Sequence, residues 1–251
     1  MYFVALLLTV RCLEEARTLE YRENRDIHHV LADYHCSLAA SHQQEDITLS
    51  FLRCEPQHTL LRLTICTREK TPVSAILETA IPSLFQHGHG RYEVQAIDLT
   101  NPRWAGISTW ADFLPQKTER FMHFSFATPL ITAVPGSQQS RNVLPFPEPL
   151  PLFSSLAHRW QMLGGPTLAG SAEQLIQAST CVVSKYRLRS LTREGSLPAP
   201  VGYLGWIEYE CLRCNPRAIA SLNALARLAF FTGTGYLTAD GMGSTTTRLS
   251  S

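Results

Sequence analysis

The chain has 251 residues, of which 45% are hydrophobic, so it can form a packed core and is not a disordered chain. Its formal net charge is +1 and its pI is about 7.7, whereas nucleic-acid-binding domains often have a pI above about 9. The composition therefore excludes a broadly basic protein, and any contact with nucleic acid has to rest on local clusters of cations.

The seven cysteines are odd in number and scattered, so they do not indicate a disulfide framework. This pattern of cysteines fits an intracellular, reducing compartment, and we expect a cytoplasmic protein. The opening segment, MYFVALLLTV, is apolar but lacks a basic leader and a cleavage site. It is also shorter than the ~20 residues that span a membrane. We expect a buried first strand here and no membrane association.

The first half of the chain alternates strand-like and helix-like segments. Ile27, Val30 and Leu31 recur at helical spacing after Asp26, a residue type that often caps a helix. After the opening strand we expect a helix over 26–42, strands over 46–54 and 59–67, a helix over 72–86 and a strand over 91–99. This β-α-β-β-α-β order is the ferredoxin-like pattern.

The patterns in the second half of the chain predict the same order of elements, although its amino-acid sequence does not repeat that of the first half. We expect a strand over 121–129, a connector over 135–151, a helix over 152–163, strands over 179–191 and 202–213, a helix over 216–231 and a strand over 244–250. The predicted fold class is therefore α+β, with two tandem ferredoxin-like (RRM-like) domains. We place them at 1–117 and 118–251, with the boundary near Leu114–Thr118.

A glycine-rich loop, GTGYLTADGMG, joins the last predicted helix to the last strand. Such a loop can turn sharply and bring backbone N–H groups close to a phosphate. A tight connection that binds no ligand explains the glycines equally well.

Several segments carry a family resemblance. The helix end and loop read AFFTGTGYLTADGMG, and upstream stand NPRWAGISTW, FSFATPLI, LPFPEPLPLFSSLAHRW and GYLGWIEYE. In this order they resemble segments of the CRISPR-associated precursor-RNA endoribonucleases of the RAMP superfamily. The loop positions that match are Gly233, Gly235, Thr238, Gly241, Met242 and Gly243. The resemblance covers residues 95–251 well, while residues 1–95 share only the element order and two histidines.

The resemblance implies two tandem ferredoxin-like domains that bind CRISPR repeat RNA and cleave it without a metal. The 2′-hydroxyl beside the scissile phosphate attacks, leaving a 2′,3′-cyclic phosphate and a 5′-hydroxyl. This reaction needs a base, an acid and a cation near the phosphate. Histidine suits the first two roles, because its ordinary pKa is about 6.5, and Lys or Arg suits the third.

By resemblance, His42 is the first candidate for the acid or base and His28 the second. They are fourteen positions apart, which is about 21 Å on an unbroken helix. They can therefore share one phosphate only if the helix breaks between Cys36 and His42. The family's lysine after the exit histidine is missing, since QQED follows His42. Arg53, or alternatively Arg25, is expected to supply the charge.

No metal or cofactor is expected. His28, His35 and His42 do not have a common metal-ligand spacing, and Cys211 and Cys214 form a lone C-x2-C without a second pair. A His-rich surface helix is the alternative interpretation of the histidines.

The best basic cluster lies in SKYRLRSLTRE, where alternate cations share one face of a predicted strand. We expect RNA contacts from Lys185, Arg187, Arg189 and Arg193, together with the loop glycines, Thr238 and Arg248. Tyr186 and Leu188 are expected to face the core, as is Trp160. The alternative is a solvated strand face.

The expected partners are CRISPR repeat RNA, the subunits of a CRISPR effector complex and a second copy of the chain. Two other functions stay open on the sequence. One is a non-catalytic subunit that binds the RNA without cutting it. The other is a ferredoxin-like scaffold that binds protein or a small ligand and shows no salt-dependent affinity for RNA.

Overall fold

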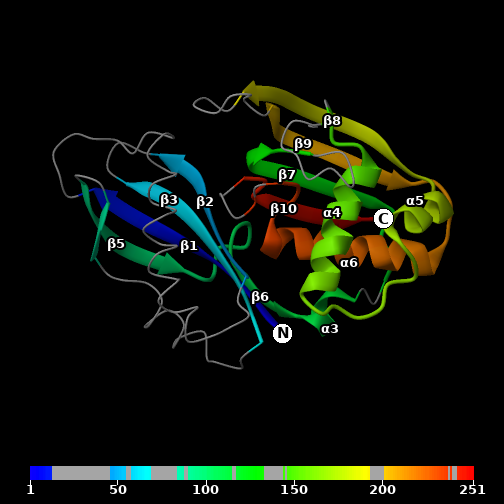
Figure 1. Ribbon diagram of the computed structural model, residues 1–251, viewed down its shortest axis with the longest axis horizontal. Coiled ribbons are helices and arrows are strands. Elements are labelled where there is room, and N and C mark those ends of the chain that lie inside the picture. Colours follow the sequence, from blue (N-terminus) through cyan, green and yellow to red (C-terminus); the bar gives the residue numbers. More distant parts are fainter. Residues whose placement is uncertain are drawn as a thin grey trace. The chain divides into compact units, whose positions relative to one another are not determined.

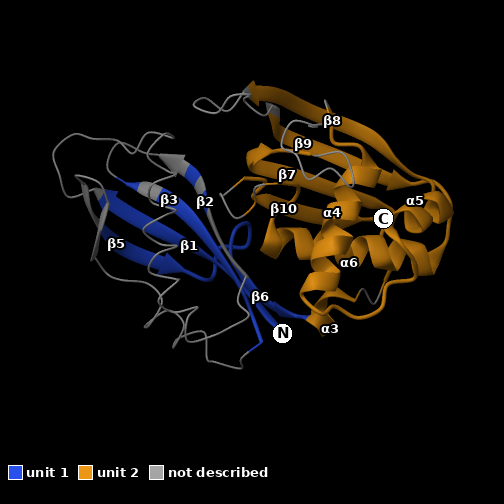
Figure 2. Ribbon diagram, viewed as in Figure 1, with its two compact units in different colours: residues 1–109, 239–241 blue, residues 110–238, 242–251 orange. Residues whose placement is uncertain are grey.

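A computed structural model describes residues 1–12, 46–54, 58–68, 84–87, 90–114, 117–132, 144, 146–192, 201–236, 238 and 242–251. The chain divides into two units (Figures 1 and 2). Unit 1 comprises Met1–Thr109 with Ala239–Gly241, and unit 2 comprises Trp110–Thr238 with Met242–Ser251. The predicted helix over 26–42 lies outside the described residues.

Unit 1 is built on an antiparallel sheet. Its strands are β1 (Tyr2–Cys12), β2 (Asp46–Cys54), β3 (Thr59–Thr67), β4 (Leu84–His87), β5 (Gly90–Asp98) and β6 (Gly106–Thr109). The order is β2-β3-β1-β5-β4, and β6 pairs with the first residues of β1. The apolar opening segment is thus a central, buried strand, as predicted.

The predicted strands at 46–54, 59–67 and 91–99 are confirmed to within a residue. The end of the helix predicted over 72–86 is wrong, because Leu84–His87 is a strand, β4. His87 pairs with Gly90 and Leu84 with Glu93, so β4 and β5 form a hairpin. Pairing between neighbouring segments overrides local helix propensity here. The rest of that predicted helix lies outside the described residues.

Unit 2 has the complete ferredoxin-like order, with one additional helix before the first strand and another after the helix that follows that strand. Its elements are α3 (Trp110–Phe113), β7 (Phe121–Leu130), α4 (Pro149–Met162), α5 (Ala172–Ser179), β8 (Cys181–Thr192), β9 (Val201–Cys211), α6 (Pro216–Thr232) and β10 (Thr245–Ser250). The strands form an antiparallel sheet in the order β10-β7-β9-β8 (Figure 1). The α+β class and the ferredoxin-like arrangement are therefore confirmed.

The two faces of the second sheet differ. Along β7, buried and half-buried residues alternate without a break, so one face is packed and the other is not. Phe124 of β7 packs edge-on against Phe153 of α4 and Tyr209 of β9, which places α4 on the packed face. We call the opposite face, which includes His123 and Ser125, the second face.

Helix α5 was missed in the sequence, although its start carries a clear signal. The side chain of Ser171 accepts a hydrogen bond from the backbone N–H of Gln174, and the Gln174 side chain accepts one from the N–H of Ser171. This reciprocal pair is a capping box, which favours a helix start. The helix ends at Thr180, whose backbone is left-handed with φ 49°.

Helix α6 is bounded at both ends by residues that suit those positions. Pro216 is its first residue, and the side chain of Asn215 accepts a hydrogen bond from the N–H of Ala218. The helix ends at Gly233, where φ is 69°. Its buried face is rich in alanine and leucine, and the same face carries the fully buried Asn223.

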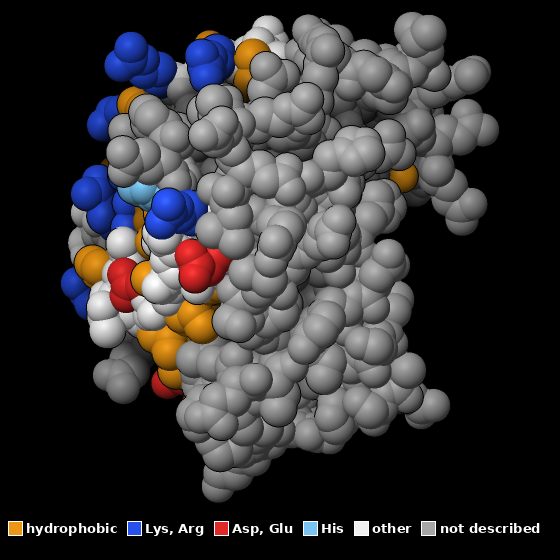
Figure 3. Space-filling model, turned by 90° about the vertical axis from the view of Figure 1, so that its left-hand side faces the viewer, with side chains coloured by type: hydrophobic (Ala, Val, Ile, Leu, Met, Phe, Trp, Pro, Cys, Tyr) orange, Lys and Arg blue, Asp and Glu red, His pale blue; other side chains and the backbone are white. Residues whose placement is uncertain are grey.

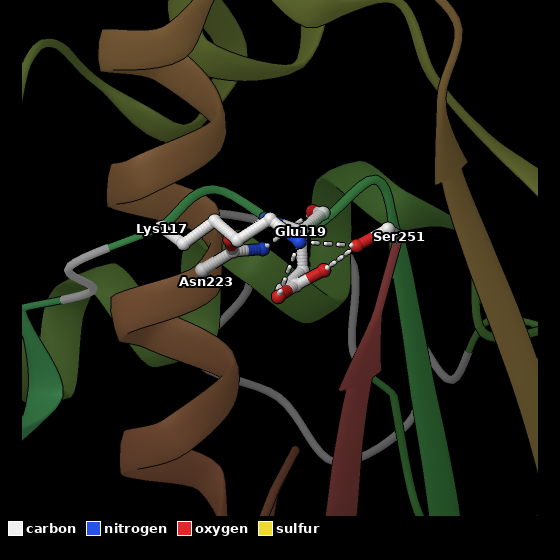
Figure 4. Close-up of polar contacts among 4 residues, drawn as sticks. All are labelled: Lys117, Glu119, Asn223 and Ser251. Atoms are coloured by element: carbon white, nitrogen blue, oxygen red, sulfur yellow. Dashed lines mark hydrogen bonds and ion pairs between the residues drawn. The ribbon is translucent and has the colours of Figure 1, made fainter.

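Asn223 fixes the segment that leads into β7. Its Oδ1 accepts a hydrogen bond from the N–H of Glu119 (2.8 Å), and its Nδ2 donates one to the carbonyl of Glu119 (3.0 Å). Ser251 donates to the Glu119 carboxylate at 2.6 Å, and Lys117 donates to Ser251 at 3.0 Å (Figure 4). The end of the chain, α6 and the start of β7 are therefore joined at one point.

We expect Asn223→Ala to lower the free energy of unfolding by about 2–3 kcal/mol, because it leaves two backbone groups of Glu119 without their buried partner. Chemical denaturation measures this change. Arg217→Ala on the exposed side of the same helix is the control, with an expected change below about 0.5 kcal/mol. Equal effects of the two substitutions would contradict the role of Asn223.

Candidate functional site

The candidate catalytic histidines, His28 and His42, lie outside the described residues. The backbone of Arg53 lies in β2, where it pairs with Leu60 directly after a register shift. The grouping of these three residues around one phosphate therefore stays a prediction.

The glycine loop is closely packed against the end of β7. Gly235 has φ 85° and Gly243 has φ 63°, a region that favours glycine. A Cβ atom at Gly235 would collide with the carbonyl oxygen of Ile131, and one at Gly243 would collide with that of Thr234. Both glycines are thus required by backbone conformation and by space.

Four N–H groups of the loop donate hydrogen bonds within unit 2. Thr234 donates to the carbonyl of Gly243 at 2.9 Å, Tyr236 donates to Ile131 at 2.8 Å, and Gly243 donates to Pro129 at 3.0 Å. The N–H of Ser244 donates to the hydroxyl of Thr128. These four N–H groups donate to acceptors of the protein itself, and the RNA contacts expected of the loop glycines stay a prediction. Residues 237 and 239–241 lie outside the described residues.

Arg159 connects helix α4 to the glycine loop. Its guanidinium donates to the carbonyl of Thr232, at the end of α6, at 2.7 Å. It also donates to the hydroxyl of Thr238 at 2.5 Å. Thr238 is 3% exposed, so its hydroxyl supports the loop from inside. The Arg-Trp segment and the glycine loop are therefore two parts of one packed structure.

Trp160 belongs to the core, as predicted. It is 2% exposed, and its indole N–H donates to the carbonyl of Pro166 at 2.6 Å. Its ring lies 4.6 Å from that of Trp110, measured between centroids. A base-stacking role for Trp160 is excluded by this burial.

The basic cluster is exposed, and the expected alternation is partly confirmed. Lys185, Arg187 and Arg189 are exposed and pair with alternate residues of β9, so they share a face. Figure 3 shows several Lys and Arg side chains near one another among the residues that it colours. Arg193 lies outside the described residues.

The expectation that Tyr186 faces the core is wrong. Its side chain is 59% exposed, and its ring packs edge-on against Phe146 at a centroid distance of 5.1 Å. β8 is an edge strand of the sheet, and its register shifts between Val183 and Lys185. A side chain on an edge strand has a neighbouring strand on one side only, so it is less covered than one in the middle of the sheet.

The second face holds further candidate residues. Arg248 of β10 is exposed and lies opposite His123 of β7. The His123 ring is stacked on that of Trp206, with centroids 5.1 Å apart and an interplanar angle of 28°. Partial burial lowers the pKa of His123, the charge of Arg248 lowers it further, and Glu208 opposes both. The neutral ring is therefore favoured. The sequence analysis singled out neither ring.

Arg62 of unit 1 has a structural role that was not predicted from the sequence. It is 1% exposed on β3, and its Nε donates to the carbonyl of Trp104 at 2.9 Å. Burial lowers the pKa of its guanidinium to about 9. Arg62 thereby fixes the NPRW segment that precedes β6.

Among the described residues, no group of His, Cys, Asp and Glu could hold a metal ion. Cys211 is buried and Cys214 is exposed, and both are free thiols. No helix in the described part of the chain is long and apolar enough to cross a membrane.

Comparison with known proteins agrees with this architecture. Residues 124–245 match the family model of the CRISPR-associated endoribonuclease Cas6. The whole chain is also similar to the solved product complex of Cas6 (TTHA0078), with 23% sequence identity and a TM-score of 0.76. The similarity covers 99% of this chain and 100% of that one. The fold is that of Cas6.

Other solved structures extend the likeness. The Cas6 (TTHB231) product complex has 22% identity and a TM-score of 0.76, and covers 98% of this chain and 100% of its own. The structure of Thermus thermophilus Cas6 (TTHB231) has 21% identity, a TM-score of 0.73 and 98% coverage of both chains. A RAMP protein that binds different RNA substrates has 16% identity and a TM-score of 0.57, and covers 98% of this chain and 99% of its own. No curated protein matches the chain. The resemblance to the Cas6 endoribonucleases is thus confirmed.

The packing of the loop that carries the Cas6 signature is testable with two glycines of similar conformation. Gly243 (φ 63°) is crowded, whereas Gly164 (φ 73°) has open space where a Cβ would lie. Gly164→Ala should cost about 1–2 kcal/mol of unfolding free energy, from backbone conformation alone. Gly243→Ala should cost more by at least ~2 kcal/mol, because the Cβ displaces the backbone of Thr234. Equal costs in denaturant unfolding would contradict the packed loop.

Proposed function

We propose that the chain is a Cas6 endoribonuclease that binds CRISPR repeat RNA and cleaves precursor crRNA within the repeat. The observation that carries the proposal is the family match over 124–245. This segment contains the described loop, the Arg159 contacts and the basic strand β8. Solved relatives include product and substrate mimic complexes, which supports RNA as the ligand.

The proposed chemistry needs no metal. A base removes the proton of the 2′-hydroxyl, the oxygen attacks the adjacent phosphorus, and the bond to the 5′-oxygen breaks as an acid protonates it. The products carry a 2′,3′-cyclic phosphate and a 5′-hydroxyl. His42 is proposed as the acid or base and His28 as the second such group, since a neutral and a protonated imidazole coexist near neutral pH. Arg53 is proposed to stabilise the charge that develops on the phosphate.

RNA binding is proposed to rest on exposed cations rather than on overall charge. Lys185, Arg187 and Arg189 follow one face of β8 at intervals of two residues, which suits a phosphate backbone or the side of a hairpin stem. Arg193 and Arg248 are proposed to extend this contact. The glycines at 233, 235, 241 and 243, with Thr238, are proposed to shape the loop that RNA approaches.

A non-catalytic crRNA-binding subunit is the second candidate. One observation favours it: QQED follows His42 where the family carries a lysine. Such a subunit would bind the same RNA and pass it to a CRISPR effector complex in the cytoplasm. Cleavage distinguishes the two proteins, because only the enzyme yields a product with a cyclic phosphate end.

The test is cleavage of an end-labelled CRISPR repeat RNA from the source organism, in excess EDTA. The wild-type protein should give one product with a cyclic phosphate end. His42→Ala should lower the single-turnover rate by about 100-fold or more, and His28→Ala by a similar or smaller factor. His158→Ala, an exposed histidine on α4, is the matched control and should leave the rate unchanged. RNA binding should be retained in all three variants.

Two results would contradict parts of this proposal. Binding without cleavage by the wild-type protein would favour the non-catalytic subunit. Cleavage that stops in EDTA and returns with Mg²⁺ would contradict the metal-free chemistry.

A further inference from the structure

Two neighbouring rows of side chains cross the second face of the sheet in unit 2. The register places Arg248 of β10 opposite His123 of β7, and Ser125 of β7 opposite Trp206 of β9. Trp206 in turn lies opposite Arg187 of β8. The four strands thus contribute two neighbouring rows. One row consists of Arg248, His123, Glu208 and Lys185, and the other of Thr246, Ser125, Trp206 and Arg187, so each row holds one ring and one arginine at its end.

The two rings are held in place by the surrounding strands. The His123 ring is stacked on Trp206, and its Nε2 lies 3.2 Å from the hydroxyl of Ser125, within hydrogen-bond distance. Gly205, next to Trp206, has φ 126°, and a Cβ there would collide with the carbonyl oxygen of Arg187. Glycine therefore lets β8 approach β9 beside the indole. Both rings are half-buried, so each keeps some exposed surface.

The charges on this face leave both end arginines available. The Glu208 carboxylate accepts a hydrogen bond from Ser184 at 2.9 Å and lies 3.7 Å from the ammonium of Lys185. The Glu210 carboxylate is paired with Arg120. Arg187 and Arg248 are exposed, and within the described part of the chain neither has a carboxylate partner.

We propose that the His123–Trp206 pair is a stacking platform for an unpaired base of the bound RNA, with Arg187 and Arg248 contacting the flanking phosphates. Every base has a flat face that stacks on an aromatic ring, and cations beside the ring attract the phosphates. Bases in a duplex are already stacked on each other, so the platform selects single-stranded RNA. This inference rests on the proposed function, because it assigns a site to the same RNA.

The test compares two single-stranded RNA probes of equal length, a short oligouridylate and a chain of abasic riboses. Trp206→Ala should weaken binding of the oligouridylate about tenfold and leave binding of the abasic chain unchanged. Trp206→Phe should retain most of the affinity, since it keeps a ring. Tyr186→Ala removes a more exposed aromatic side chain from β8 and is the control, with no change expected.

The arginines have a separate readout. For single strands, the slope of log affinity against log salt changes by about 0.7 for each phosphate contact. Arg187→Gln and Arg248→Gln should each reduce the slope by about this amount, whereas Trp206→Ala should leave it unchanged. If Trp206→Ala fails to fold, His123→Ala should weaken binding of the oligouridylate about threefold or more.

The outcomes separate the two proposals. Wild-type affinity for oligouridylate that neither Trp206→Ala nor His123→Ala reduces would overturn the platform and leave the endoribonuclease intact. Equal loss of affinity for both probes would also overturn it, because stacking cannot act on an abasic chain. No binding of any RNA by the wild-type protein would overturn both proposals, and a protein partner would then be the better occupant of this face.

Discussion

The contacts of Arg159 with the end of α6 and with Thr238 are the interaction on which the arrangement of unit 2 depends. One guanidinium donates to the last carbonyl of a helix and to a hydroxyl of the loop that follows it. The side chain is half-buried, and charge-assisted hydrogen bonds are stronger than neutral ones in such a setting. Helix α4, helix α6 and the glycine loop are thereby joined to one another, and the strand that follows the loop, β10, pairs with β7.

This arrangement gives the glycines of the loop a role in packing. The glycines permit backbone to pack on backbone, as Gly243 does against Thr234 and Gly235 against Ile131. Packing alone therefore requires these glycines, apart from the role in RNA binding that we propose for the loop. The cations and rings that suit RNA lie elsewhere, on the second face and on β8, and the fold places them by strand register.

Much of the fold could be predicted from the sequence because its signals are local. The strands of both units follow apolar patterning, and α6 follows from Pro216 and the Asn215 cap. β4 was missed because its pairing with β5 is a contact between segments, which periodicity does not report. Tyr186 was misplaced because an edge strand with a shifted register does not bury every second residue.

The candidate site was less predictable. Lys185, Arg187 and Arg189 stand close together in the sequence, so a strand pattern found them. His123 and Trp206 are 83 positions apart, and only the pairing of β7 with β9 brings them together. The roles of His42, His28 and Arg53 rest on resemblance and stay predictions.

In the proposed reaction, the attacking group is the RNA's own 2′-hydroxyl. The most direct test is a repeat RNA with a single 2′-deoxy substitution at the nucleotide before the scissile phosphate. We expect this RNA to bind as tightly as the unmodified repeat and not to be cleaved at that position in single-turnover reactions. Cleavage at an undiminished rate would mean that water attacks the phosphate, and would contradict the account.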